Sequence, residues 1–239
     1  YISYVNNPIR YVDALGDTVA RFDYQTGGLI DFVDDGKEEW SGLITGVNNE
    51  DPDNPELVFM TFQFNDQKED VAALKNGVIN KVKIVKNDKM NKMLEESGVN
   101  ESYSDYESEK KLKIWGTVKG PLGYALDEGE GAMDYKVQNG LDKSTLYIVK
   151  KRGYNDLDFG NFMWGRGMKK LNINLMTSLI GAQYNNFKWG KKQIMKDMDK
   201  GPGTYEGWSI FDSQADQNAI IHGWHYPKSP GAYKLDLPK

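Results

Sequence analysis

A regular alternation of apolar and polar residues near the start of the chain constrains its fold most strongly. Residues 18–24 alternate with a period of two, and apolar runs follow over 29–33, 40–47 and 57–64. Glycine-containing turns and an Asn-, Asp- and Pro-rich loop at 48–55 separate these runs. A period of two between turn residues is typical of half-buried strands. The sequence therefore predicts a small antiparallel sheet over residues 18–64.

Helical spacing appears next. Residues 66–76 and 87–97 each place apolar side chains on one helical face, and 78–85 has the composition of a strand between them. Residues 101–111 are rich in Asn, Glu, Ser and Asp and show no periodic face, which indicates a linker. Further strands are predicted over 113–118 and 146–150, on either side of a glycine-rich acidic loop at 119–133.

The remainder of the chain is predicted to be mainly helical. Asp158 can cap a helix that opens at Phe159, and Asn174 can cap the next one. Ser213 and Asp216 have capping-box spacing, which predicts a last helix that ends at Gly223. We expect an α+β fold in which a small antiparallel strand-rich N-terminal unit precedes a mainly helical C-terminal domain.

The predicted organisation has four parts. They are an end segment at 1–17, a strand-rich α+β adaptor domain at 18–100, a linker at 101–111 and a helix-rich domain at 112–239. The chain begins with Tyr1, so we expect a piece of a longer protein whose export signal lies outside it. No apolar run approaches the roughly 20 residues that span a bilayer.

Residue counts exclude several kinds of chemistry. The 239-residue chain has no cysteine, which excludes disulfides, thiolate metal sites and a cysteine nucleophile. It has only two histidines, His222 and His225, which excludes a histidine-rich zinc site. Both would lie at the end of the last helix, where the dipole favours a protonated imidazole, so a structural role is favoured over catalysis. We predict no metal and no cofactor.

The net charge of −5 is unevenly distributed. Residues 1–142 carry 15 basic and 27 acidic side chains, whereas 143–200 carry 12 basic and 4 acidic ones, a net charge of +8. A basic block suggests an anionic partner. It is equally compatible with basic helices that pack on an acidic neighbour in the same chain.

The first 17 residues contain Tyr4, an Asn7-Pro8 pair, a short apolar stretch and then Asp13-Ala-Leu-Gly16-Asp17. This segment resembles the closing segment of the RHS repeat-associated core, although Ala14 stands where that family usually has proline. In RHS proteins the segment marks the end of a delivery shell and the start of a variable cargo. The resemblance implies that the chain after Asp17 is cargo, usually a toxin.

Three short elements lie at 131–136, 154–165 and 212–223. In this order they resemble the polymorphic toxin type 44 family, with its glycine-acidic-aromatic-lysine patch, its Asp-x-Gly-Asn-aromatic helix start and its terminal acidic helix. The resemblance covers about half of the chain, from residue 112 to 226. The aromatic of the first patch is Tyr135 here, and His222 precedes the final glycine.

Four polar residues within these elements are candidates for a catalytic site. Asp134 and Asp216 can share acid and base duties if they face each other across a cleft, and Asn161 can orient the substrate. Asp158 belongs to the same set, but it can equally be a helix N-cap, and Asp216 can simply complete its capping box. Buried carboxylates and amides must be paired, whether the site is structural or catalytic.

The candidate substrate-binding residues are basic or aromatic. They are Lys169, Lys170, Lys192 and Trp164. Interleaved lysines and aromatics can bind phosphates and stack on bases. The alternative is that the aromatics are helix core and the lysines the solvated face of that helix.

Together these features lead us to expect a secreted bacterial RHS-linked toxin, delivered from the cell that makes it. We favour a hydrolase that acts on nucleic acid in competitor cells, with RNA as the favoured substrate. The alternatives are a cell-wall (peptidoglycan) hydrolase using the same carboxylates, and a non-enzymatic surface or carbohydrate-binding module. The expected partners are an immunity protein, the RHS shell of the parent chain and an anionic polymer.

Overall fold

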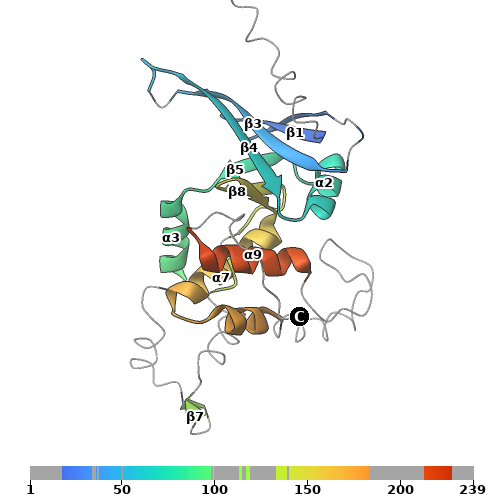
Figure 1. The fold of residues 1–239 in the computed structure, drawn as a ribbon. Helices are drawn as coiled ribbons and strands as arrows, with labels where there is room; N and C mark the ends of the chain where they lie inside the picture. The colour runs from blue at the N-terminus through green and yellow to red at the C-terminus, as the bar shows by residue number, and fades with distance from the viewer. Residues whose placement is uncertain are drawn as a thin grey trace, which may run out of the picture. The chain divides into compact units, whose positions relative to one another are not determined.

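A computed structural model gives the fold in Figure 1 and describes residues 18–33, 36, 38–49, 51–97, 99, 113–114, 117–118, 133–138, 140–183 and 213–227. The chain divides into two compact units. The first unit is Tyr1–Ile84 with Lys143–Asn155, and the second is Val85–Asp142 with Asp156–Lys239. The RHS-like segment, the predicted linker and the basic stretch at 184–200 lie outside the described residues.

The compact units do not divide where the predicted domains do. Helix α3 (Asn87–Glu96) belongs to the second unit, whereas strands β8 (Thr145–Val149) and β9 (Arg152–Tyr154) belong to the first. All five residues of β8 are buried. A strand that is buried along its whole length belongs inside a sheet that is covered on both faces. The chain therefore leaves the first unit after residue 84 and returns to it for β8 and β9.

The first unit contains a sheet of seven strands in the order β2-β1-β3-β4-β9-β8-β5. The strands not yet defined are β1 (Thr18–Asp23), β2 (Leu29–Val33), β3 (Trp40–Asn48), β4 (Glu56–Phe64) and β5 (Lys81–Ile84). The predicted α+β class is confirmed. The prediction of an antiparallel sheet is wrong, because β1–β3, β4–β9 and β5–β8 are parallel pairs. The returning β8–β9 hairpin enters between β4 and β5, which sequence periodicity does not reveal.

The two ends of this sheet meet. Gly28 forms an antiparallel bridge with Lys81, and the amide of Leu29 donates to the carbonyl of Asn80 over 2.8 Å. The amide of Val82 donates to the carbonyl of Gly27 over 2.7 Å. Gly27 has a φ of +71°, and a Cβ there would collide with the Val82 carbonyl. Glycine at this position is therefore required for β5 to approach the start of β2.

The core of the first unit lies between this sheet and α2 (Gln67–Lys75). Phe62 is 2 % exposed, and its ring occupies the space over Gly42, its register partner on β3. From α2, Val71 and Leu74 pack into the same cluster. The helix begins as predicted, since the side chain of Asp66 accepts a hydrogen bond from the amide of Glu69.

The described part of the second unit is mainly helical, as expected. The helices described there are α3, α6 (Tyr135–Gln138), α7 (Asp156–Lys170), a helix at 175–183 and α9 (Gln214–His225). A two-strand hairpin joins β6 (Lys113–Ile114) to β7 (Thr117–Val118). In Figure 1, α7 and α9 lie side by side, and they pack against each other more extensively than any other pair of described elements in the second unit. In the described part of the chain, no helix combines the length and the apolarity that a membrane crossing requires.

The helix ends test the predicted caps. Ser213 and Asp216 form the predicted capping box, and Asn174 accepts a hydrogen bond from the amide of Thr177 over 2.9 Å. Helix α9 continues to His225, two residues beyond the predicted end at Gly223. Asp158 does not cap α7 as predicted, because the helix already begins at Asp156. The preceding acidic residue opens the helix and places Asp158 inside its first turn.

Candidate functional site

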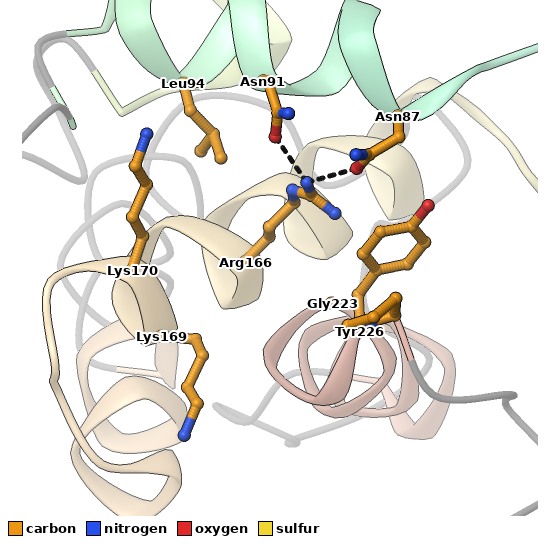
Figure 2. A pocket seen from close by; sticks show the side chains of 9 residues that line it. Asn87, Asn91, Leu94, Arg166, Lys169, Lys170, Gly223 and Tyr226 are labelled. Atoms are coloured by element: carbon orange, nitrogen blue, oxygen red, sulfur yellow. Dashed lines mark hydrogen bonds between the residues drawn. The ribbon is translucent and has the colours of Figure 1, made fainter.

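A cavity of about 270 Å³ lies within the second unit (Figure 2). Its walls come from α3, from the end of α7 and from the turn after α9. The lining residues are Asn87, Asn91, Leu94, Arg166, Lys169, Lys170, Gly223, Tyr226 and Pro227. Three of these residues are cationic and none is acidic. The cavity is therefore a candidate anion-binding site.

Arg166 is the most firmly held cation of this cavity. Its Nη2 donates to the side-chain oxygens of Asn87 and Asn91, each over 2.6 Å, as Figure 2 shows. Its guanidinium carbon lies 4.2 Å from the ring centroid of Tyr226, in cation–π contact. Nε and Nη1 are shielded from solvent and have no hydrogen-bond partner among the described residues. Arg166 is thus fixed in position with part of its donor capacity unused.

Burial lowers the pKa of Arg166, and the nearby Tyr226 partly opposes this effect. The guanidinium nevertheless stays charged at neutral pH, because arginine does not lose its proton in proteins. Asn87 and Asn91 supply neutral acceptors, so they orient this charge without cancelling it. A fixed, uncancelled positive charge is suited to a phosphate or carboxylate ligand.

Lys169 and Lys170 extend the positive charge to the surface, where both are exposed. The Nζ of Lys169 lies 3.8 Å from the ring centroid of Trp224. Trp224 is anchored in turn, because its indole N–H donates to the carbonyl of Ile173 over 2.9 Å. Both lysines occupy the last turn of α7, where the helix dipole also favours cations. Their position therefore serves helix stability and anion attraction together.

Asn161 and Asp216 meet across the α7–α9 contact, away from the cavity lining. The Asn161 side-chain amide donates to one carboxylate oxygen of Asp216. The other oxygen accepts hydrogen bonds from the Oγ of Ser213 over 3.0 Å and from its backbone amide over 3.3 Å. The structure thus brings two predicted site residues together. Asp216 also completes the capping box of α9, which is the structural role given above as the alternative to catalysis.

The other predicted catalytic residues occupy different surroundings. Asp134 is half-buried immediately before α6, and the prediction that it faces Asp216 across a cleft stays a prediction. Asp158 is only 3 % exposed. Asp134, Asp158, Asn161 and Asp216 do not line the cavity. No group of three or more His, Cys, Asp or Glu side chains within the described ranges could hold a metal ion.

The predicted substrate-binding residues have three different outcomes. Lys169 and Lys170 line the cavity. Trp164 is 6 % exposed, and its indole N–H donates to the carbonyl of Ser178 over 3.1 Å. This tryptophan is packed between α7 and the helix at 175–183, so its assignment to substrate binding is corrected to a core role. Lys192 lies outside the described residues.

Sequence reasoning missed Arg166, Tyr226 and the two asparagines. The asparagines are four residues apart on α3 and so lie on the same face of one helix. Two amides at this spacing in an otherwise amphipathic helix are a usable signal. Nothing in the sequence connects them with an arginine 75 residues further along the chain.

Comparison with known proteins gives no match. No family model, no curated protein and no solved structure resembles this chain significantly. The resemblances to the RHS core and to the type 44 toxins therefore stay predictions, and functional inference depends on the geometry of the second unit.

Tyr135, the aromatic of the first predicted element, is buried beside the cavity-forming helices. Its hydroxyl lies 2.9 Å from the Oγ of Ser97, which donates to the carbonyl of Leu94. It also lies close to Gly167, where an added Cβ would approach it within 3.1 Å. Burial raises the pKa of Tyr135 well above its ordinary value, with the Ser97 hydrogen bond acting weakly in the opposite direction. The folded state therefore holds this proton more tightly than the unfolded state does.

We expect Tyr135 to make the second unit sensitive to alkali. Its contribution is fully present below the unfolded-state pKa of about 10 and is lost as pH rises above that value. Tyr135→Phe should cost about 1 kcal/mol at pH 8, where it removes one hydrogen bond, and the difference should shrink or reverse at pH 11. Urea unfolding of both proteins at each pH measures this difference. A gap that is independent of pH would contradict the prediction.

Proposed function

We propose that the chain is an RHS-linked toxin effector whose second unit binds and hydrolyses a nucleic acid, with RNA as the favoured substrate. The observation that carries this proposal is the cavity lined by Arg166, Lys169 and Lys170 without a carboxylate. Phosphate is the anion that repeats along every nucleic acid, and lysine and arginine contacts to it supply most non-specific affinity.

Binding and chemistry have separate candidates in this proposal. The cavity cations neutralise phosphates, and Arg166 acts as a fixed donor because its asparagine partners hold it. Asp134 and Asp216 are assigned acid and base roles, and Asn161, which hydrogen bonds to Asp216, is assigned substrate orientation. All six residues belong to the second unit, but the three catalytic candidates do not line the cavity. A polymer of several nucleotides is therefore the substrate class that fits both sets.

Salt-dependent RNA binding by the full chain tests the binding half. We expect Lys169→Gln/Lys170→Gln to reduce the slope of log affinity against log salt by about 1.4, because each phosphate contact on single-stranded RNA contributes about 0.7. Lys92→Gln/Lys143→Gln removes the same charge from exposed positions outside the cavity and should leave most of the slope unchanged. Equal effects of the two double variants would show that only net charge matters.

Toxicity on expression tests the hydrolytic half and separates it from the alternatives. A nuclease kills in the cytoplasm with loss of RNA, and Asp134→Ala should abolish this killing. Killing only after periplasmic targeting would support the cell-wall alternative, and no killing at either location would support a binding module. A fully toxic Asp134→Ala protein would refute the catalytic assignment.

A further inference from the structure

Strand β4 of the first unit has an open edge along most of its length. It pairs with β3 from Glu56 to Gln63, but on its other side it meets β9 only at Gln63 and Phe64. Residues 56–62 therefore have no neighbouring strand on this side within the described part of the chain. In Figure 1 the loop end of the β3–β4 hairpin extends well beyond the short part of β4 that pairs with β9.

The backbone groups at this edge can be identified from the β9 contact. The amide of Gln63 donates to the carbonyl of Lys151 over 3.0 Å, so Gln63 directs its backbone toward this side. Alternate residues of a strand direct their amide and carbonyl groups to the same side. Leu57, Phe59 and Thr61 therefore present their backbone donors and acceptors at the open edge, ready for another strand.

The side chains do not protect this edge. Leu57 is 63 % exposed and Phe59 is 60 % exposed, and residues 57–64 include no charge and no proline. Proteins usually protect free edges with lysine, proline, bulges or short strands, because an exposed apolar edge pairs with other chains. An unprotected edge of this length indicates that another strand covers it.

The two ends of the edge carry opposite charge. The loop before β4 contributes Asp51 and Asp53, and β4 begins with Glu56, all of them exposed. At the other end, exposed Lys150 and Lys151 form the β8–β9 turn beside Gln63. No lysine or arginine occurs between residues 38 and 65. The edge is thus an uncharged strand with an acidic end and a basic end.

We propose that a second copy of this chain occupies the open edge of β4, antiparallel and centred on Phe59. A two-fold axis at Phe59 places Glu56 of one copy opposite Phe62 of the other, next to the partner copy's basic turn, and does so at both ends. Leu57 lies opposite Thr61 of the other copy, and the two Phe59 side chains lie opposite each other. The paired segment of seven residues spans about 24 Å and forms about six interstrand hydrogen bonds.

Charge selects a second copy over an unrelated strand. A partner for this edge needs an uncharged extended segment with a basic group at the acidic end and an acidic group at the basic end. The chain's own β4 edge meets this requirement when it is turned through the two-fold axis, because its two ends exchange places. The resulting interface joins two first units and does not depend on the function proposed for the second.

Cysteine cross-linking of the full chain tests the register, and the absence of natural cysteine removes background. At the two-fold axis the two Cα atoms of residue 59 lie about 5.5 Å apart, within the range that a disulfide spans. Phe59→Cys should therefore give a covalent dimer on mild oxidation. Leu57→Cys is the matched control, because it is equally exposed but the Cα atoms of its two copies lie roughly 14 Å apart.

Charge reversal tests the two ends independently. We expect the unmodified chain to sediment as a concentration-dependent dimer, and Glu56→Lys or Lys151→Glu alone to raise its dissociation constant roughly tenfold. The double reversal Glu56→Lys/Lys151→Glu should restore the dimer. The proposal is overturned by a chain that stays monomeric at all concentrations, by equal cross-linking at 57 and 59, or by a double reversal that stays as weak as the single ones.

Discussion

Gly165→Ala is expected to lower the free energy of unfolding of the second unit by about 3 kcal/mol or more, because overpacking against backbone cannot relax easily. A Cβ at Gly165 would lie far inside the 3.0 Å limit of real contacts from the carbonyl oxygen of Ile220 on α9. Gly223 on α9 faces the carbonyl of Phe162 on α7 equally closely. The two helices approach each other through these paired glycines, so a methyl group on either one must push them apart.

Gly160→Ala in the same helix is the matched control. The nearest atoms to an added Cβ there belong to the Lys136 side chain, beginning with its Cγ, so rotation of that side chain and no shift of a neighbouring helix backbone can relieve the contact. Alanine also gains roughly 1 kcal/mol of helix propensity over glycine, which offsets the cost of moving Lys136, so this variant should lose much less stability than Gly165→Ala. Urea unfolding followed by circular dichroism and tryptophan fluorescence compares the variants. Equal stability of Gly165→Ala and Gly160→Ala would show that α7 and α9 do not require this close approach.

Local patterns predict the local structure of residues 18–96 well. The alternation over residues 18–24 and the apolar runs that follow correspond to β1–β4, and helical spacing corresponds to α2 and α3. The order in which the strands pair cannot be predicted from local patterns, because it depends on partners that are distant in the sequence. Strand β9 has only three residues, too few for a period to be recognised, yet it joins β4 to β8 and forms one of the parallel pairs of the sheet.

In the candidate site, too, some residues can be recognised from the sequence and others cannot. Lys169 and Lys170 are recognisable because basic residues cluster in this part of the sequence. Arg166 is not, because its role comes from two amides on another helix and from a tyrosine beyond α9. Trp164 illustrates the opposite error, since an aromatic residue near lysines can stack on a ligand or pack in the core, and only tertiary structure distinguishes the two.

Asn161 and Asp216 are an intermediate case. Both are half-buried, and polar residues among apolar neighbours need partners, which these two provide for each other. Their hydrogen bond holds α7 to α9 whether or not Asp216 also transfers a proton. Sequence can therefore predict that such residues are paired, but it cannot assign their chemistry.

Arg166→Met is expected to destabilise the second unit by about 3 kcal/mol and to release α3 from α7. The variant keeps a long side chain but removes both hydrogen bonds to the side chains of Asn87 and Asn91. Bonds from a charged donor contribute about 1.5–3 kcal/mol each, and the apolar replacement recovers part of that loss. Lys170→Met is the control, since it removes the same charge from the same cavity without touching the asparagines. Hydrogen exchange in α3 should accelerate in the first variant alone.

Arg166→Lys separates the two roles of this arginine. Lysine keeps the charge but lacks the planar fork, so it can satisfy the two amide oxygens less completely and should retain an intermediate stability. If the guanidinium fork of Arg166 also binds phosphate, RNA affinity measured on the folded Arg166→Lys protein should fall although the charge is kept. RNA affinity that is unchanged in a folded Arg166→Lys protein would limit this residue to joining α3 and α7, and the two lysines alone would then account for anion binding.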